Sequence, residues 1–279
     1  MRSSRRDPTN LRLKPLAAAD WLLAAAICLV PIGVLVAYSF GRTSVVTQDV
    51  SLTGTIRSYR TLFGPLYRPV LMRSITLSAL TVALCVGLGT PAALAISRLS
   101  QRWRDRAVLA LLFPSFVSFT VRIFAWQGLL GSDGPIKALT GRALLFHPPA
   151  VLIGMVATYV PLFVLPAYVA VARVGPNVLD AALDLGARRF RQTTSVTLPL
   201  AAPGVLTGAV VVGVLSLGEF VVPTVLGGGK VLLLGEILFE RGATRDQPLG
   251  GAIVAAMLVM FAIVGAASWA LRRVVSRHA

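Results

Sequence analysis

The sequence is that of an apolar and strongly basic chain. Of its 279 residues, 56% are hydrophobic and 14% are charged, with a mean hydropathy of +0.77 and a formal net charge of +16. A soluble globular domain carries charge on about a quarter of its residues, so this composition indicates a membrane protein. The two cysteines and two histidines have no metal-ligand spacing and supply no catalytic pair, which disfavours a membrane enzyme.

Six apolar runs are long enough to cross a bilayer, since about 20 apolar residues span its hydrocarbon core as a helix. Lipid offers the backbone no hydrogen-bond partner, and the runs lack the alternation of a transmembrane β-barrel, so each is predicted to be helical. The predicted spans are residues 21–40, 74–97, 107–131, 150–172, 200–225 and 248–271, and the fifth apolar run continues to residue 229.

Lysines and arginines set the predicted orientation. If the N-terminus is cytoplasmic, the inside segments carry 16 of the 27 basic residues and the outside segments carry 10, while Arg122 lies within a span. The bias is strongest at residues 98–106, which hold four arginines. Both termini are therefore predicted to be cytoplasmic. Cations beside spans meet anionic lipid headgroups, which accounts for the high net charge without nucleic acid as a partner.

Two charged side chains lie within the apolar runs, where charge is costly and is usually functional or paired. Along straight helices, Glu219 lies about 28 Å beyond Leu200, and Arg122 lies about 24 Å beyond Arg106, which places both in the outer half of the membrane. Three interpretations of Glu219 are open. It forms an ion pair with Arg122, it faces a cavity and attracts a cationic substrate, or it reaches the outer interface.

Two aromatic residues are further candidates for the substrate pathway. Trp126 and Tyr159 lie in apolar runs, and an aromatic face attracts an ammonium group. The alternative is that they pack within the protein or anchor it at the membrane interface. The candidates for a substrate pathway or gate are therefore Glu219, Arg122, Trp126 and Tyr159.

Residues 180–199 form a polar, cationic segment between the fourth and fifth runs, on the predicted cytoplasmic side. Residues 180–185 are predicted to form a short helix with Asp180 as its N-cap, and residues 187–194 a second helix. Gly186 between them can adopt a positive φ, as helix ends often require. Two short helices that meet at a glycine form a compact body able to insert into a cleft of a partner protein. The alternative is an amphipathic loop that lies on the membrane surface.

This segment resembles the coupling motif of ABC importer permeases, E-A-A-x-x-x-G followed by nine residues and I-x-L-P. Here the motif appears as Asp180-Ala181-Ala182, Gly186 and Val196-Thr197-Leu198-Pro199. Asp replaces Glu and Val replaces Ile, which keeps charge and shape. In that family the loop docks into a groove on a separate cytoplasmic ATPase. The resemblance implies that the coupling residues are Asp180, Ala181, Ala182, Gly186, Arg189, Phe190, Leu198 and Pro199.

Three further stretches resemble the permeases of spermidine/putrescine importers, and most closely their B-type subunit. They are residues 113–131, 151–171 and 216–226, and the likeness covers roughly residues 70–270. The resemblance implies transport of a polyamine or a related small organic cation. Alternatives are an ABC importer permease for an amino-acid derivative, an anion or ferric iron, and an ion-driven secondary transporter, which would leave the coupling motif unexplained.

The resemblance also implies a fold and a location. The fold is an all-α polytopic membrane protein with six transmembrane helices, the MetI-like fold of ABC importer permeases, in the bacterial inner membrane. Residues 1–20 would form a cytoplasmic tail. Residues 21–279 would form a single transmembrane permease domain, with the coupling loop at residues 173–199.

The implied role is that of a non-catalytic transport subunit. It would pair with a second permease subunit, with two copies of a cytoplasmic ABC ATPase and an extracytoplasmic substrate-binding protein. The chain itself would bind no cofactor, because ATP and magnesium would bind at the ATPase. The nearest approach to a phosphate-binding loop, residues 227–230, lacks the upstream glycine and the following Ser or Thr, so it is predicted to be a turn.

Overall fold

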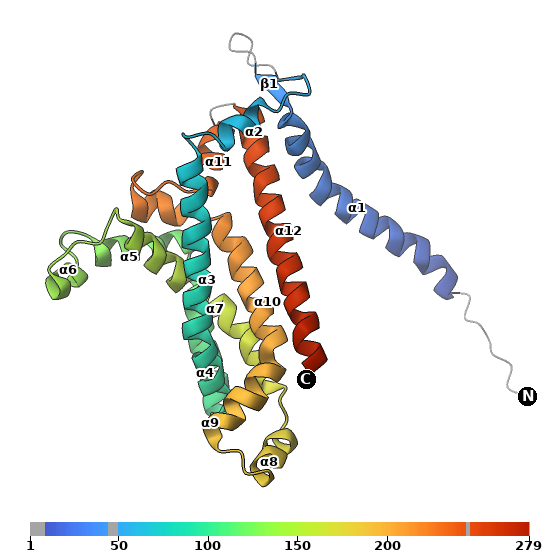
Figure 1. Cartoon of the computed structure of the whole chain (residues 1–279), viewed down its shortest axis with the longest axis vertical. Coiled ribbons are helices and arrows are strands. Elements are labelled where there is room, and N and C mark those ends of the chain that lie inside the picture. Colours follow the sequence, from blue (N-terminus) through green and yellow to red (C-terminus); the bar gives the residue numbers. More distant parts are fainter. Residues whose placement is uncertain (1–8, 44–49, 244–245, 279) are drawn as a thin grey trace, which may run out of the picture. The chain divides into compact units, whose positions relative to one another are not determined.

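Helices dominate the computed structural model, which describes residues 9–43, 50–243 and 246–278 (Figure 1). The expected all-α class is therefore confirmed. The helices are α1 (Thr9–Tyr38), α2 (Arg57–Leu62), α3 (Arg68–Ser97), α4 (Gln101–Phe116), α5 (Phe119–Leu130), α6 (Pro135–Thr140), α7 (Pro148–Ala172), α8 (Pro176–Asp184), α9 (Arg189–Gln192), α10 (Leu198–Leu217), α11 (Leu234–Ala243) and α12 (Gln247–His278), with π-helical turns η1 (Thr193–Thr197) and η2 (Pro223–Gly227).

The chain divides into two compact units. Unit 1 comprises residues 1–62 and 241–255, and unit 2 comprises residues 63–240 and 256–279. Unit 1 contains α1, α2 and the first part of α12. It also contains a small antiparallel sheet, in which β1 (Gly41–Thr43) pairs with β2 (Val50–Leu52).

Polar and aromatic contacts fasten α2 to the end of α1 within unit 1. The ring of Tyr59 lies 5.4 Å from the ring of Phe40, centroid to centroid. The hydroxyls of Tyr59 and Ser39 lie within hydrogen-bond distance of each other, at 2.8 Å. These contacts hold the chain where it turns from α1 into the sheet.

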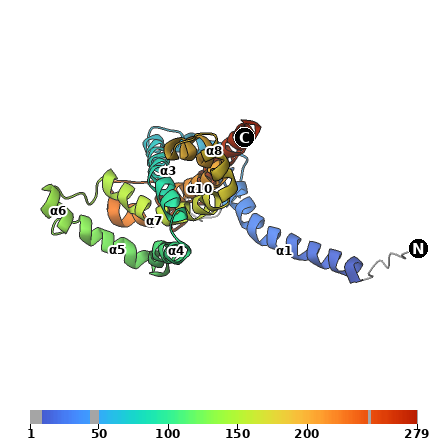
Figure 2. The ribbon, with the colours of Figure 1, turned by 90° about the horizontal axis from the view of Figure 1, so that it is seen from below.

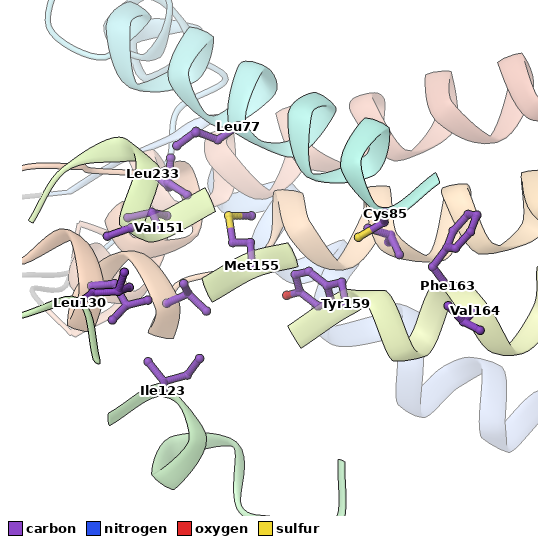
Figure 3. Packing of buried hydrophobic residues seen from close by; sticks show 14 of the residues in the cluster. Leu77, Cys85, Ile123, Leu130, Val151, Met155, Tyr159, Phe163, Val164 and Leu233 are labelled. Carbon is purple, nitrogen blue, oxygen red and sulfur yellow. The ribbon is translucent and has the colours of Figure 1, made fainter. Parts of the chain in front are cut away.

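Helices α3, α7 and α10 form the centre of unit 2 and lie side by side, as the view from below shows (Figure 2). Each has a proline in its first turn, where the missing amide hydrogen costs no helical hydrogen bond. Their buried side chains form one apolar cluster, which includes Cys85 from α3 and Met155 from α7 (Figure 3). Val212 of α10 belongs to the same cluster. Ile123 of α5 joins the same cluster.

Four described helical segments are long and apolar enough to cross a membrane. They are residues 68–97, 148–172, 189–217 and 247–271, and the bent pair of α4 and α5 makes a fifth candidate if it is counted as one span. The first predicted span, residues 21–40, overlaps α1, whose described apolar stretch Ala25–Tyr38 is shorter than a full crossing. By length and composition the structure therefore supports four or five of the six predicted spans.

The structure differs from the expected straight helices in two of the apolar runs. The chain bends by 91° between residues 101–116 (α4) and residues 119–140 (α5 and α6), because Val117 adopts an extended conformation (φ −76°, ψ 140°) just after Pro114 in the last turn of α4. The fifth run stops at Leu217, and helical structure resumes only at Val221. Both breaks lie beside the charged residues within the apolar runs.

Close packing of the three central helices depends on glycines around Phe163. This ring is fully buried in α7 and lies between Gly89 of α3 and Gly208 of α10. A Cβ at Gly89 would overlap the ring, and a Cβ at Gly208 would lie 2.9 Å from its Cδ2 atom and 3.0 Å from the Phe163 carbonyl oxygen. Small residues thus let the three backbones approach one another, as in other helix pairs within membranes.

The first prediction concerns Gly89→Ala. The added methyl group has no space beside the Phe163 ring, so we expect a loss of about 1–3 kcal/mol from overpacking. The measurement is the apparent Tm of the purified protein in mild detergent. Gly87→Ala is the matched control on the same helix, because nothing lies within 4 Å of its added Cβ, and it should keep or slightly raise the Tm. Equal Tm values for the two variants would contradict this account of the packing.

Candidate functional site

The predicted coupling segment folds into a compact body at one end of unit 2 (Figure 1). It consists of α8, a turn at Gly186 and α9, residues 176–192, and is called the knob below. Gly186 has φ +80°, and the amides of Gly186 and Ala187 donate to the carbonyls of Leu183 (2.8 Å) and Ala182 (2.9 Å). These bonds close the end of α8 in a left-handed turn, a conformation that glycine adopts at little cost.

A side-chain hydrogen bond connects the two helices of the knob, α8 and α9. The Nε2 atom of Gln192 donates to the carbonyl of Leu179 at 2.7 Å, which joins α9 to α8. The helices themselves begin at other residues than expected. Because α8 starts at Pro176 with Gly175 as its N-cap residue, Asp180 lies inside the helix and the prediction that it is the N-cap is wrong. Thr193 belongs to a π-helical turn rather than to a second α-helix.

The predicted coupling residues differ in their exposure. Ala182 is buried, whereas Asp180, Ala181, Gly186 and Arg189 are exposed; Leu198 and Pro199 are partly buried in the first turn of α10. The knob also exposes large apolar side chains, with Leu185 89% exposed, Phe190 81% exposed and Leu183 51% exposed. A rigid backbone with exposed apolar side chains is suited to docking, either in a cleft of another protein or against a membrane surface.

The second candidate region centres on Glu219, in the break that follows α10. Its side chain is buried (8% exposed) and accepts three hydrogen bonds. The hydroxyl of Tyr159 donates to Oε2, and the amides of Val221 and Val222 donate to Oε1 at 2.9 and 3.3 Å. The Tyr159 hydroxyl also lies 3.3 Å from the Leu215 carbonyl. The carboxylate therefore caps the helical segment that begins at Val221. Its hydrogen bond with Tyr159 also connects this break to α7.

Arg122 has different partners from Glu219. Its Nη1 atom donates to the Pro114 carbonyl at 3.2 Å, and its guanidinium lies 5.7 Å from the centre of the Phe119 ring. These contacts place it at the bend between α4 and α5, where it satisfies a carbonyl at the end of α4. The depth expected for Arg122 along a straight helix therefore does not apply. The structure brings Tyr159 together with Glu219, and it does not bring Arg122 to them.

Trp126 is partly buried and packs against the apolar cluster of unit 2. The ring of Tyr159 is buried in the same cluster (Figure 3), with its hydroxyl engaged as described. Both side chains therefore take part in packing in the structure, and a role of either in the substrate pathway stays a prediction.

Sequence reasoning missed Glu236, a buried acid of α11. It is 4% exposed, and its Oε2 atom has no hydrogen-bond partner among the described residues. Burial raises the pKa of this carboxyl above its ordinary value of 4.5. The Thr224 hydroxyl, which donates to the Phe220 carbonyl at 2.6 Å, lowers this pKa, but burial has the larger effect. An acid flanked on both sides by apolar residues, as in LLLGEILF, was the available signal.

Known structures share this architecture. A chain of the bacterial alginate ABC transporter, solved with an alginate pentasaccharide-bound periplasmic protein, matches with a TM-score of 0.71 and 15% identity over 96% of both chains. A chain of the inward-facing MetNI methionine ABC transporter matches with a TM-score of 0.59 and 14% identity, over 76% of this chain and 99% of that one. The fold is therefore the expected MetI-like fold of ABC importer permeases.

Sequence relatives place the chain more closely. The spermidine/putrescine transport system permease protein PotB of Haemophilus influenzae is 31% identical over 75% of this chain and 77% of that protein. PotB of Escherichia coli is 27% identical over 84% and 90%. The molybdenum transport system permease protein ModB of Mycobacterium bovis is 30% identical over 69% and 70%.

Residues 86–279 match the family described as binding-protein-dependent transport system inner membrane component. The chain belongs to this family. It is thus a transport component with several membrane-crossing helices, and the predicted resemblance to the spermidine/putrescine permeases is confirmed.

The second prediction concerns the Tyr159–Glu219 hydrogen bond. Tyr159→Phe leaves a buried carboxylate oxygen without its donor, so we expect a loss of about 1–3 kcal/mol in stability. The apparent Tm in detergent measures it. Tyr168→Phe removes a hydroxyl from the same helix and is the matched control, with little expected change. If both phenylalanine variants have the same apparent Tm as the wild type, the Tyr159–Glu219 hydrogen bond does not stabilise the fold.

The third prediction follows from the raised pKa of Glu236. Above pH 4.5 the Glu236 carboxyl loses its proton in the unfolded chain but keeps it in the folded protein, because its folded pKa is higher. The contribution of Glu236 to stability therefore falls as the pH rises from 4.5 through the folded pKa. Glu236→Gln, which stays neutral, should therefore have a higher apparent Tm than the wild type at pH 7 and a similar one near pH 4.5. Glu240→Gln, at an exposed position of α11, is the control and should change the profile less. A constant difference across this pH range would rule out the titration.

Proposed function

We propose that this chain is the membrane-spanning permease subunit of an ATP-driven importer of polyamines, such as spermidine and putrescine, or of related small organic cations. Membership of the binding-protein-dependent family and the PotB relatives support this function. The second candidate is a permease for an anion. It is supported by the similarity to the molybdenum transport permease ModB, which covers a smaller part of the chain. The two candidates differ in the charge of the cargo, which an uptake assay separates.

We propose that the knob docks into the cytoplasmic ATPase. The observation that carries this assignment is the exposed apolar surface of Leu185 and Phe190, held on a backbone that turns at Gly186. The arginines beside it are also exposed and add positive charge around the apolar centre. A loop that lay on the membrane would need no fixed left-handed turn and no bond between its two arms.

The proposed assembly pairs this subunit with a second permease subunit, with two copies of the ATPase and with an extracytoplasmic binding protein. The distribution of arginines and lysines supports a cytoplasmic position for both termini. ATP and magnesium bind at the ATPase, and this chain catalyses no reaction. Closure of the ATPases moves the two coupling loops together, and the central helices then open toward the binding protein.

Within this scheme, Glu219 and Tyr159 support transport by holding the outer end of α10 against α7. The carboxylate already accepts three hydrogen bonds, so a cationic cargo would have to displace the Tyr159 hydroxyl or backbone amides to bind it directly. Arg122 and Trp126 lie on α5 beyond the bend. Their proposed role is to hold that segment beside the pathway.

The fourth prediction tests coupling. Gly186→Asp places a side chain where φ is +80°, so we expect the knob to lose its shape while the spans still insert in the membrane. The tagged wild-type chain should co-purify with an ATPase and a second permease, and the reconstituted complex should take up labelled spermidine when ATP is supplied. The variant should insert normally and lose most ATP-driven uptake.

Gly175→Asp is the matched control for this experiment. It adds the same charge to the same loop, but Gly175 has φ −64° and occupies the N-cap position of α8, which aspartate favours. It should transport like the wild type. Normal uptake by Gly186→Asp would exclude the proposed coupling role. Uptake of molybdate in place of spermidine would support the anion permease, and a chain that purifies alone and transports without ATP would indicate an ion-driven carrier.

A further inference from the structure

The backbone connection between the knob and α10 is an irregular turn. In η1 the amide of Leu198 bonds to the carbonyl of Thr193, five residues earlier, which is the π-helical spacing. Two threonine hydroxyls bond back to the preceding turn, from Thr194 to the Phe190 carbonyl at 3.0 Å and from Thr197 to the Gln192 carbonyl at 3.3 Å. Such π-turns often lie at functional sites, and threonines that bond back to the main chain bend helices.

A second connection runs from the same place to α3. The Nη2 atom of Arg98 donates to the Thr193 hydroxyl at 2.7 Å, and that hydroxyl donates to the Arg189 carbonyl at 3.0 Å. Arg98 is the C-cap residue of α3, where its own amide bonds to the carbonyls of Ala95 and Ile96. A continuous chain of hydrogen bonds therefore leads from the end of α3 through η1 to α9.

The other arginines of residues 98–106 make different contacts. Arg104 donates to the Leu99 carbonyl at 3.2 Å, and the guanidinium of Arg106 lies 5.1 Å from the centre of the Trp103 ring. Arg102 is exposed and has no side-chain partner in the part of the chain that the structure describes. Arg98 thus differs from its neighbours, although all four have the same charge and lie within nine residues of the sequence.

We propose that Arg98 is a positioning residue for coupling, which transmits displacement of the knob to α3 through Thr193. This role rests on the proposed docking of the knob into an ATPase. Helix α10 receives the same displacement through η1, and both helices pack on α7. The Arg98–Thr193 hydrogen bond would make α3 and α10 move together. Without this bond, η1 could absorb part of the motion by bending locally.

The test uses the complete transporter in proteoliposomes, with labelled spermidine as cargo and phosphate release as the measure of ATP hydrolysis. Arg98→Ala should assemble with the ATPase as the wild type does and lower the spermidine transported per ATP by roughly three- to tenfold, the factor expected for loss of one hydrogen bond. Thr193→Val should lower it to a similar extent. Thr193→Ser keeps the hydroxyl and should transport normally, as should the matched control Arg102→Ala.

The double variant Arg98→Ala with Thr193→Val decides whether the two residues act through one bond. Its loss should equal that of either single variant, and a loss equal to the product of the two would overturn the link. Arg98→Ala behaving like Arg102→Ala, or failing to assemble with the ATPase, would also overturn it. Gly186→Asp separates this inference from the proposed function. If that variant loses uptake while Arg98→Ala keeps it, coupling through the knob stands and only the Arg98 link fails.

Discussion

Inside a bilayer, every backbone amide needs a hydrogen-bond partner from the protein, and this constraint is most visible where α10 ends. The fifth apolar run does not continue as one helix, so the segment that restarts at Val221 has unpaired amides at its beginning. The carboxylate of Glu219 accepts from two of them, and Tyr159 completes its coordination. A charged residue in an apolar run thus has a structural role. It stabilises the break after α10, and its hydrogen bond with Tyr159 connects this break to α7.

Helix α7 is the element on which α3, α4, α5, α10 and η2 pack in unit 2. Its Phe163 ring fits between glycines of α3 and α10, and its Tyr159 holds the segment after α10. Other close approaches also involve α7: Gly204 of α10 faces Ala170, and Gly154 of α7 faces Leu226 of η2. Because side chains at these positions would force the backbones apart, the central helices form a unit that is able to transmit motion with little internal slack.

The two ends of α10 are built differently from its middle. A π-helical turn precedes it on the side of the knob, and the Glu219 break and a second π-helical turn follow it. Regular helix lies between two places where the backbone departs from the α-helical pattern. In the proposed transporter, a rigid α10 would carry displacement from the ATPase side to the outer break, while the irregular turns would allow its ends to reorient.

The sequence by itself determined the class of the protein. Long apolar runs require helices in lipid, and the motif that ends in Leu198 and Pro199 is sufficient to predict a coupling segment. The helix breaks within the apolar runs could not be predicted, because an apolar composition shows that a segment is suited to lipid but does not show where its helix stops. Straight helices permit an Arg122–Glu219 pair, which is one of the three interpretations of Glu219. The structure instead gives Glu219 the Tyr159 hydroxyl as a partner, and Arg122 the Pro114 carbonyl beside the 91° bend. Only the tertiary structure decided that Arg98 meets Thr193, 95 residues along the chain, since contacts between distant segments depend on how the helices pack.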